Sequence, residues 1–115
     1  MADNCLFCKM VSGAIPPDKV YETPRVLAFR DINPQAPVHV LVVPKQHVAT
    51  LNEARPEDAQ LLGELFLAAR EVAARTGIAD GGYRTVLNCN ADAGQSVFHL
   101  HLHVLGGRQM RWPPG

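Results

Sequence analysis

The segment that most constrains the fold is SVFHLHLHVLGG, residues 96–107. Apolar and polar residues alternate through it, which is the pattern of a β-strand with one buried face. Side chains two positions apart share a face of a strand, so His99, His101 and His103 are expected on one side of it. The solvent-facing positions of an ordinary strand would carry residues such as Thr, Lys or Glu. Three histidines in these positions therefore indicate a chemical role.

The remainder of the chain predicts an α+β fold, with a short helix before an antiparallel sheet of five strands and one long helix. The long helix is expected over 57–76, where apolar residues recur at helical spacing between Pro56 and Gly77. The connections at 22–25 and 89–97 are too short for helical crossovers, so we expect antiparallel strands covered on one face by the helix. The expected strands are 19–22, 25–31, 38–45, 83–88 and the histidine segment.

The composition limits the partners and the compartment. The 115 residues suffice for a single domain spanning 1–115, and 47% hydrophobic residues is ordinary for a globular protein. Eleven basic and eleven acidic side chains balance, so neither nucleic acid nor an anionic membrane is expected as a partner. We find no secretory signal and no apolar run of about 18 residues. Three cysteines are too few for a disulfide framework, so a cytoplasmic protein is expected.

Three histidines on one extended strand cannot all bind one zinc ion. The α-carbons of His99 and His103 would lie about 13 Å apart, whereas the ligand atoms of tetrahedral zinc lie about 3.4 Å from one another. The other histidines need another role, and a neutral imidazole nitrogen is a nucleophile suited to phosphoryl transfer. The preceding loop adds Gly94, whose backbone a ligand can approach closely, and the hydroxyl of Ser96. This combination favours an anion-handling site.

The run HLHLHVL resembles the pattern of the histidine-triad (HIT) family. Three segments, 31–47, 94–110 and the terminal WPPG at 112–115, are similar to its Hint branch, the nucleoside phosphoramidate hydrolases. The resemblance implies a HIT-like fold. It also implies hydrolysis of a purine nucleoside phosphoramidate, such as adenosine 5′-phosphoramidate, through a covalent nucleotidyl-histidine that releases a nucleoside monophosphate. A diadenosine polyphosphate hydrolase and a nucleotide-binding module with incidental hydrolysis stay open as alternatives.

The resemblance also implies roles for particular residues. His101 matches the nucleophile, His103 a phosphate contact and proton relay, Ser96 a leaving-group or phosphate contact, and His39 a fourth histidine near the triad. Asp31 matches a residue that accepts hydrogen bonds from ribose hydroxyls, although a turn residue would look the same. His39 could equally be a hydrogen-bonded core residue. The implied nucleotide contacts are Asp31, Ile32, Asn88, Gly94, Gln95, Ser96, His101 and His103, with Phe29 and Leu41 as further walls for the base or as simple core.

The pair Cys5-x-x-Cys8 raises a separate question, because two thiolates at this spacing hold a tetrahedral ion but leave two ligands to be found. His47 and His99 are the candidates. Family members that keep such a pair have a structural Cys₂His₂ zinc site at these positions, and the resemblance implies the same site here. The alternative is two small buried residues. Zinc is therefore expected as a structural cofactor. No cofactor is expected for the chemical step.

The C-terminal segment RQMRWPPG has two prolines and a terminal glycine, which predicts irregular structure. In the Hint branch, a similar tail lies near the partner subunit's site in a homodimer. The resemblance therefore implies a homodimer with Trp112 at the interface or near the substrate.

Overall fold

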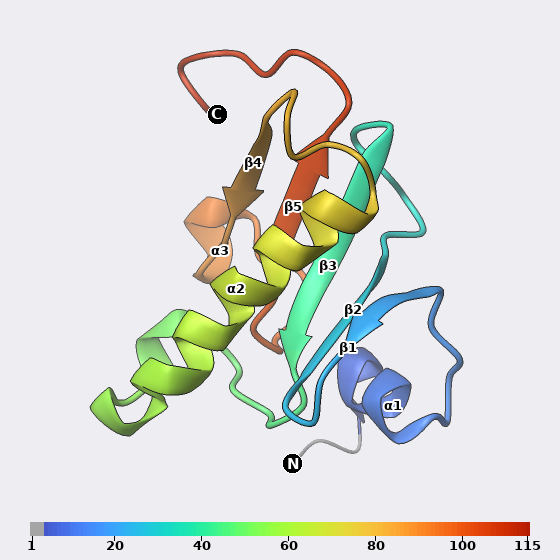
Figure 1. Ribbon diagram of the computed structural model, residues 1–115. Helices are drawn as coiled ribbons and strands as arrows, with labels where there is room; N and C mark the ends of the chain where they lie inside the picture. Colours follow the sequence, from blue (N-terminus) through green and yellow to red (C-terminus); the bar gives the residue numbers. More distant parts are fainter. Residues whose placement is uncertain (1–3) are drawn as a thin grey trace.

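A five-stranded antiparallel sheet forms the centre of the computed structural model, which describes residues 4–115 (Figure 1). The strands lie in the order β1-β2-β3-β5-β4, and every neighbouring pair is antiparallel. The α+β fold and the antiparallel sheet are confirmed. The strands are β1 (Lys19–Glu22), β2 (Val26–Arg30), β3 (Val38–Pro44), β4 (Tyr83–Val86) and β5 (Leu102–Gly106).

The helices are α1 (Leu6–Ser12), α2 (Ala59–Arg75) and α3 (Asn90–Ala93), with 3₁₀ turns at Leu51–Glu53 and Pro56–Asp58. The long helix begins two residues later than expected, because the 3₁₀ turn precedes it and the Asp58 carboxylate accepts a hydrogen bond from the Arg55 main-chain N–H at 2.9 Å. The single turn α3 was not predicted, since four residues show no helical periodicity. Among residues 4–115, no helix is long and apolar enough to cross a bilayer.

Helix α2 lies across one face of the sheet (Figure 1). Its apolar stripe repeats every three to four residues, which places these side chains on one side of the helix. They pack against the valines and leucines that β2, β3 and β5 direct to the same face, and this contact forms the main core. The buried α2 residues are Leu61, Leu65, Ala68, Ala69, Val72 and Ala73.

The opposite face of the sheet is also partly covered, and the expectation of a sheet covered on one face was therefore incomplete. Phe7 of α1 packs there against Leu27, Phe29, Leu41 and Val43. This second cluster explains why β3 is buried along nearly its whole length instead of alternating.

The histidine segment is not one continuous strand. The chain bends at 97–99, and β5 begins only at Leu102. The main-chain N–H of Leu100 donates to the Val48 carbonyl at 2.6 Å, outside the β3–β5 ladder. The prediction of one continuous strand was wrong, because the bend leaves the fully buried His99, and His101, before the start of β5.

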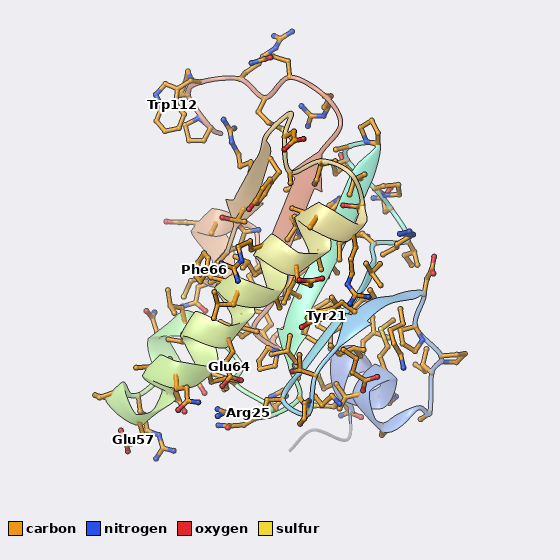
Figure 2. The ribbon with its side chains drawn as sticks, viewed as in Figure 1. Tyr21, Arg25, Glu57, Glu64, Phe66 and Trp112 are labelled. Carbon is orange, nitrogen blue, oxygen red and sulfur yellow. The ribbon has the colours of Figure 1, made fainter. Side chains whose placement is uncertain are left out.

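One ion pair and one cation–π contact connect the β1–β2 hairpin to α2 on the outer surface. Arg25 lies 3.5 Å from Glu64, and the two labels sit close together in Figure 2. The guanidinium of Arg75 lies 4.8 Å from the centre of the Tyr21 ring. Because these groups are exposed, each contact contributes only about 1 kcal/mol or less to stability, and docking of α2 depends mainly on its apolar side.

Candidate functional site

A cavity of about 220 Å³ opens on the face of the sheet opposite α2. It brings together the sequence-predicted residues Asp31, Ile32, Ser96, His101 and His103, which come from segments far apart in the chain. Phe29 and Leu41, the predicted walls for the base, also line it. Asn88, Gly94 and Gln95 do not line it. The roles of all these residues as nucleotide contacts stay predictions. The remaining lining residues are Leu6, Phe7, Met10, Arg30 and Val97.

His101 is held with its Nε2 nitrogen free. Its Nδ1 lies 2.7 Å from the carbonyl oxygen of His99. A carbonyl only accepts hydrogen bonds, so Nδ1 carries the hydrogen and Nε2 keeps its lone pair. Burial lowers the pKa of His101 below its usual value. A neutral, oriented imidazole of this kind is a competent nucleophile.

His103 and His39 form a second oriented pair. The main-chain N–H of Gln35 donates to Nδ1 of His39 at 3.0 Å, so the hydrogen of His39 is on Nε2. That nitrogen lies 2.9 Å from Nδ1 of His103, which must accept. The hydrogen of His103 is then on Nε2, where it can be donated to a bound oxygen or nitrogen. His39, with a side chain only 4% exposed, sets the tautomer of His103 from behind the cavity wall.

Asp31, directly after β2, is a turn residue that also lines the cavity. One oxygen accepts a hydrogen bond from the Asn33 main-chain N–H at 2.9 Å, which is a turn interaction. The other lies 3.4 Å from Nε2 of His39. A carboxylate has about four acceptor sites, so capacity remains for hydroxyl donors in the cavity.

The second cluster joins Cys5, Cys8, His47 and His99, which could hold a metal ion. Nδ1 of His99 lies 3.2 Å from the Cys5 sulfur, 3.4 Å from the Cys8 sulfur and 3.2 Å from Nδ1 of His47. Nδ1 of His47 is in turn 3.3 Å from the Cys8 sulfur.

The position of the hydrogen on the His99 ring shows whether these four side chains could bind a cation. Nε2 of His99 donates to the Pro44 carbonyl at 2.7 Å, which leaves a bare lone pair on Nδ1. One lone pair faces two sulfurs and another imidazole nitrogen, at separations close to the roughly 3.4 Å between ligands of a tetrahedral ion. The Pro44 carbonyl is the outer hydrogen-bond partner that metal-binding histidines usually have. The four residues therefore fit a metal.

A model of the HIT domain matches residues 12–110. The chain belongs to the HIT domain family. An uncharacterized HIT-like protein of Synechocystis sp. is 55% identical over 115 residues, which cover all of both chains. A HIT family hydrolase from Legionella pneumophila is 52% identical with a TM-score of 0.95, over 97% of this chain and 100% of that one. A HIT family hydrolase from Clostridium thermocellum is 49% identical with a TM-score of 0.93, over 96% of each chain.

The loop before the triad of this HIT domain is fixed by Gln95. Its side-chain oxygen accepts from the Asn90 main-chain N–H at 2.8 Å. Its amide nitrogen donates to the carbonyls of Ala49 at 2.9 Å and Val97 at 3.1 Å. The buried side chain thus spends its main hydrogen-bonding groups on the backbone, and it holds Ser96 at the cavity.

The sequence reasoning missed the contribution of α1 to the cavity. Leu6, Phe7 and Met10 line it, and the Phe7 ring centre lies 5.1 Å from that of His101. The available signal was the apolar residues interleaved with the two cysteines.

The free energy of unfolding is expected to fall as the pH decreases from 6.5 towards 4. Burial, His101 and His39 lower the pKa of His103 from 6.5 to about 4, and Asp31 opposes them only in part. Above pH 6.5 this histidine is neutral in both states. Below it, the unfolded chain binds the proton first, so about 1 kcal/mol of stability is lost per pH unit until the folded state also titrates.

Urea unfolding at pH 7.0 and 5.0 measures this effect. His103→Asn removes the titrating group, so its stability should change less between the two pH values than that of the unmodified protein. The difference between the two proteins reports the titration of His103 together with its coupling to His39 and His101. An equal pH dependence in the two proteins would contradict the assignment.

Proposed function

We propose that this chain is a nucleotidyl hydrolase of the Hint branch, which cleaves purine nucleoside phosphoramidates through a covalent nucleotidyl-histidine on His101. The observation that carries the proposal is the orientation of His101, whose Nδ1 is bound to the His99 carbonyl while Nε2 stays free at the cavity. The similar Legionella and Clostridium structures are described as HIT family hydrolases, which supports hydrolysis in general.

The proposed reaction has two displacements at phosphorus. In the first, Nε2 of His101 attacks, the phosphorus–nitrogen bond to the leaving amine breaks, and the amine takes up a proton from the solvent. The Nε2–H of His103 and the hydroxyl of Ser96 donate hydrogen bonds to the phosphoryl oxygens or the leaving group as charge moves. In the second, water attacks phosphorus, the bond to His101 breaks, and a nucleoside monophosphate and one proton are released.

The nucleoside half of the substrate is proposed to occupy the rest of the cavity. Asp31 accepts hydrogen bonds from the ribose hydroxyls with its remaining acceptor sites. The apolar side chains of Ile32, Phe29 and Leu41 surround a flat purine ring. We also propose ribose and phosphate contacts with Asn88, Gly94 and Gln95. These residues do not line the cavity, so the bound ligand would have to extend beyond it to reach them.

Zinc is proposed as the metal of the four-residue cluster. Two thiolates and two imidazoles are a donor set typical of structural zinc. All four positions are filled by protein, which leaves no open position for substrate. When bound, zinc would supply a cross-link between α1 and the segments that follow β3 and precede β5, and the chemical step uses only the residues of the cavity.

A second copy of the chain is proposed as the protein partner. Strand β4 lies at the end of the sheet, so one of its edges is free to pair. Large apolar side chains are exposed near this end of the molecule and on α2: Tyr83 is 38%, Phe66 53% and Trp112 82% exposed (Figure 2). The guanidinium of Arg84 lies 5.9 Å from the Trp112 ring centre and holds the tail near β4.

Incubation of the purified protein with adenosine 5′-phosphoramidate or a diadenosine polyphosphate, in parallel, tests the function. We expect AMP release, measured by chromatography, to be faster from the phosphoramidate. Faster release from the dinucleotide would favour the alternative hydrolase. AMP binding without turnover of either compound would favour a nucleotide-binding module and contradict the proposal.

A further inference from the structure

Helix α1 belongs to both the metal cluster and the nucleotide cavity. Cys5 caps its N-terminus, accepting a hydrogen bond from the Cys8 main-chain N–H at 3.3 Å, and Cys8 lies in its first turn. The side chains between and beyond these ligands, Leu6, Phe7 and Met10, line the cavity. A change in the position of this one short helix would therefore alter both sites.

Few other interactions hold α1 on the sheet. The helix has seven residues, and Phe7 is its only buried residue. A helix of this length is not stable alone in water, so its structure depends on docking. Against the rest of the protein, it relies on the packing of Phe7, with Met10 and Val11 partly buried against the same cluster, and on the convergence of Cys5 and Cys8 with two histidines.

His99 connects the cluster directly to the nucleophile. Its ring contributes Nδ1 to the cluster, while its carbonyl oxygen accepts the hydrogen bond that orients His101. The Phe7 ring packs edge-on against both imidazoles, with centre-to-centre distances of 5.9 Å to His99 and 5.1 Å to His101. It also packs against Phe29 at 5.4 Å. The cluster, Phe7 and the apolar wall of the cavity are thus one packed unit.

We infer that a zinc ion on these four residues acts as a latch that docks α1 and completes the nucleotide cavity, so that metal and nucleotide bind cooperatively. The inference rests on the proposed nucleotide binding. Without the metal, α1 loses its cross-link, and the wall formed by Leu6, Phe7 and Met10 no longer meets the base. Coupling of two binding equilibria is reciprocal, so AMP must tighten zinc binding by the same factor as zinc tightens AMP binding, about tenfold or more.

Calorimetric titration of AMP into the zinc-loaded and the metal-free protein tests the latch. We expect the dissociation constant of AMP to rise at least about tenfold without zinc. Cys8→Ser should show the weak affinity even when zinc is added. Cys89→Ser is the matched control, because this third cysteine lies outside the cluster, and it should bind AMP as the unmodified protein does.

Two further measurements do not depend on turnover. Zinc transfer to a chromogenic chelator should be slower when AMP is bound. Amide hydrogen exchange over 6–12 should be faster in the metal-free protein while the strands stay protected. Equal AMP affinity in the two metal states, or loss of protection throughout the sheet, would overturn the latch. Absence of AMP binding to the zinc-loaded protein would instead overturn the proposed function, and the cooperativity with it.

Discussion

His101→Ala is expected to lower kcat for adenosine 5′-phosphoramidate by at least about 10⁴-fold, because the substitution removes the group proposed to form the covalent intermediate. AMP binding should change by only a few-fold, since the residues proposed to contact the ribose and the base remain. Steady-state AMP release and calorimetric titration measure the two quantities separately. This separation distinguishes a lost nucleophile from a collapsed cavity.

Detection of the intermediate sharpens this experiment. Acid-labile attachment of a nucleotidyl group to the peptide containing 96–107 should be seen by mass spectrometry in the unmodified protein and not in the variant. Gln60→Ala is a suitable control, because Gln60 is exposed on α2 and bonds only to the Glu64 side chain. Turnover by His101→Ala at the rate of the unmodified protein would remove His101 from the mechanism.

Leu65→Ala is expected to lower the free energy of unfolding by about 2–5 kcal/mol. Leu65 is 1% exposed and lies in the main core between α2 and the sheet, where truncation leaves a cavity that the surrounding strands cannot readily fill. Urea unfolding at one fixed protein concentration measures the change, since self-association would otherwise shift the apparent stability.

Arg70→Ala provides the comparison within the same helix. Arg70 is exposed on α2, and substitutions at such positions usually change stability by no more than about 0.5 kcal/mol. A large loss at Leu65 with a small loss at Arg70 is the expected pattern. Equal losses at both positions would mean that α2 does not dock through its apolar stripe.

Much of the fold could be predicted because its elements leave local patterns. The helical repeat between Pro56 and Gly77 and the apolar runs of β2 and β3 were read correctly to within a few residues. The family resemblance carried by the triad and its neighbouring motifs also agrees with the match of the HIT domain model. Alternation within Leu102–Gly106 correctly placed His103 on the face opposite the main core.

Other features leave no local pattern. The strict alternation of 96–104 predicted one strand, yet tertiary contacts bend the chain at His99, whose ring is anchored by the Pro44 carbonyl. The place of α1 over the cavity depends on contacts of Cys8 with His47 and His99. These histidines lie 39 and 91 positions further along the chain. Main-chain carbonyls orient the rings of His99 and His101. Every residue carries such a carbonyl, so the residue types do not indicate these contacts.

The sequence by itself determined the kinds of element, their order, and which side chains carry chemistry, because these follow from residue type and from periods of two and 3.6 residues. Only the tertiary structure decided the contacts, the tautomer and the burial of each histidine. The tautomer of an imidazole depends on which donor or acceptor lies within about 3 Å of each nitrogen, and its charge depends on burial. Through these contacts His99 faces the sulfurs, His101 keeps a free Nε2, and His103 keeps a hydrogen to donate.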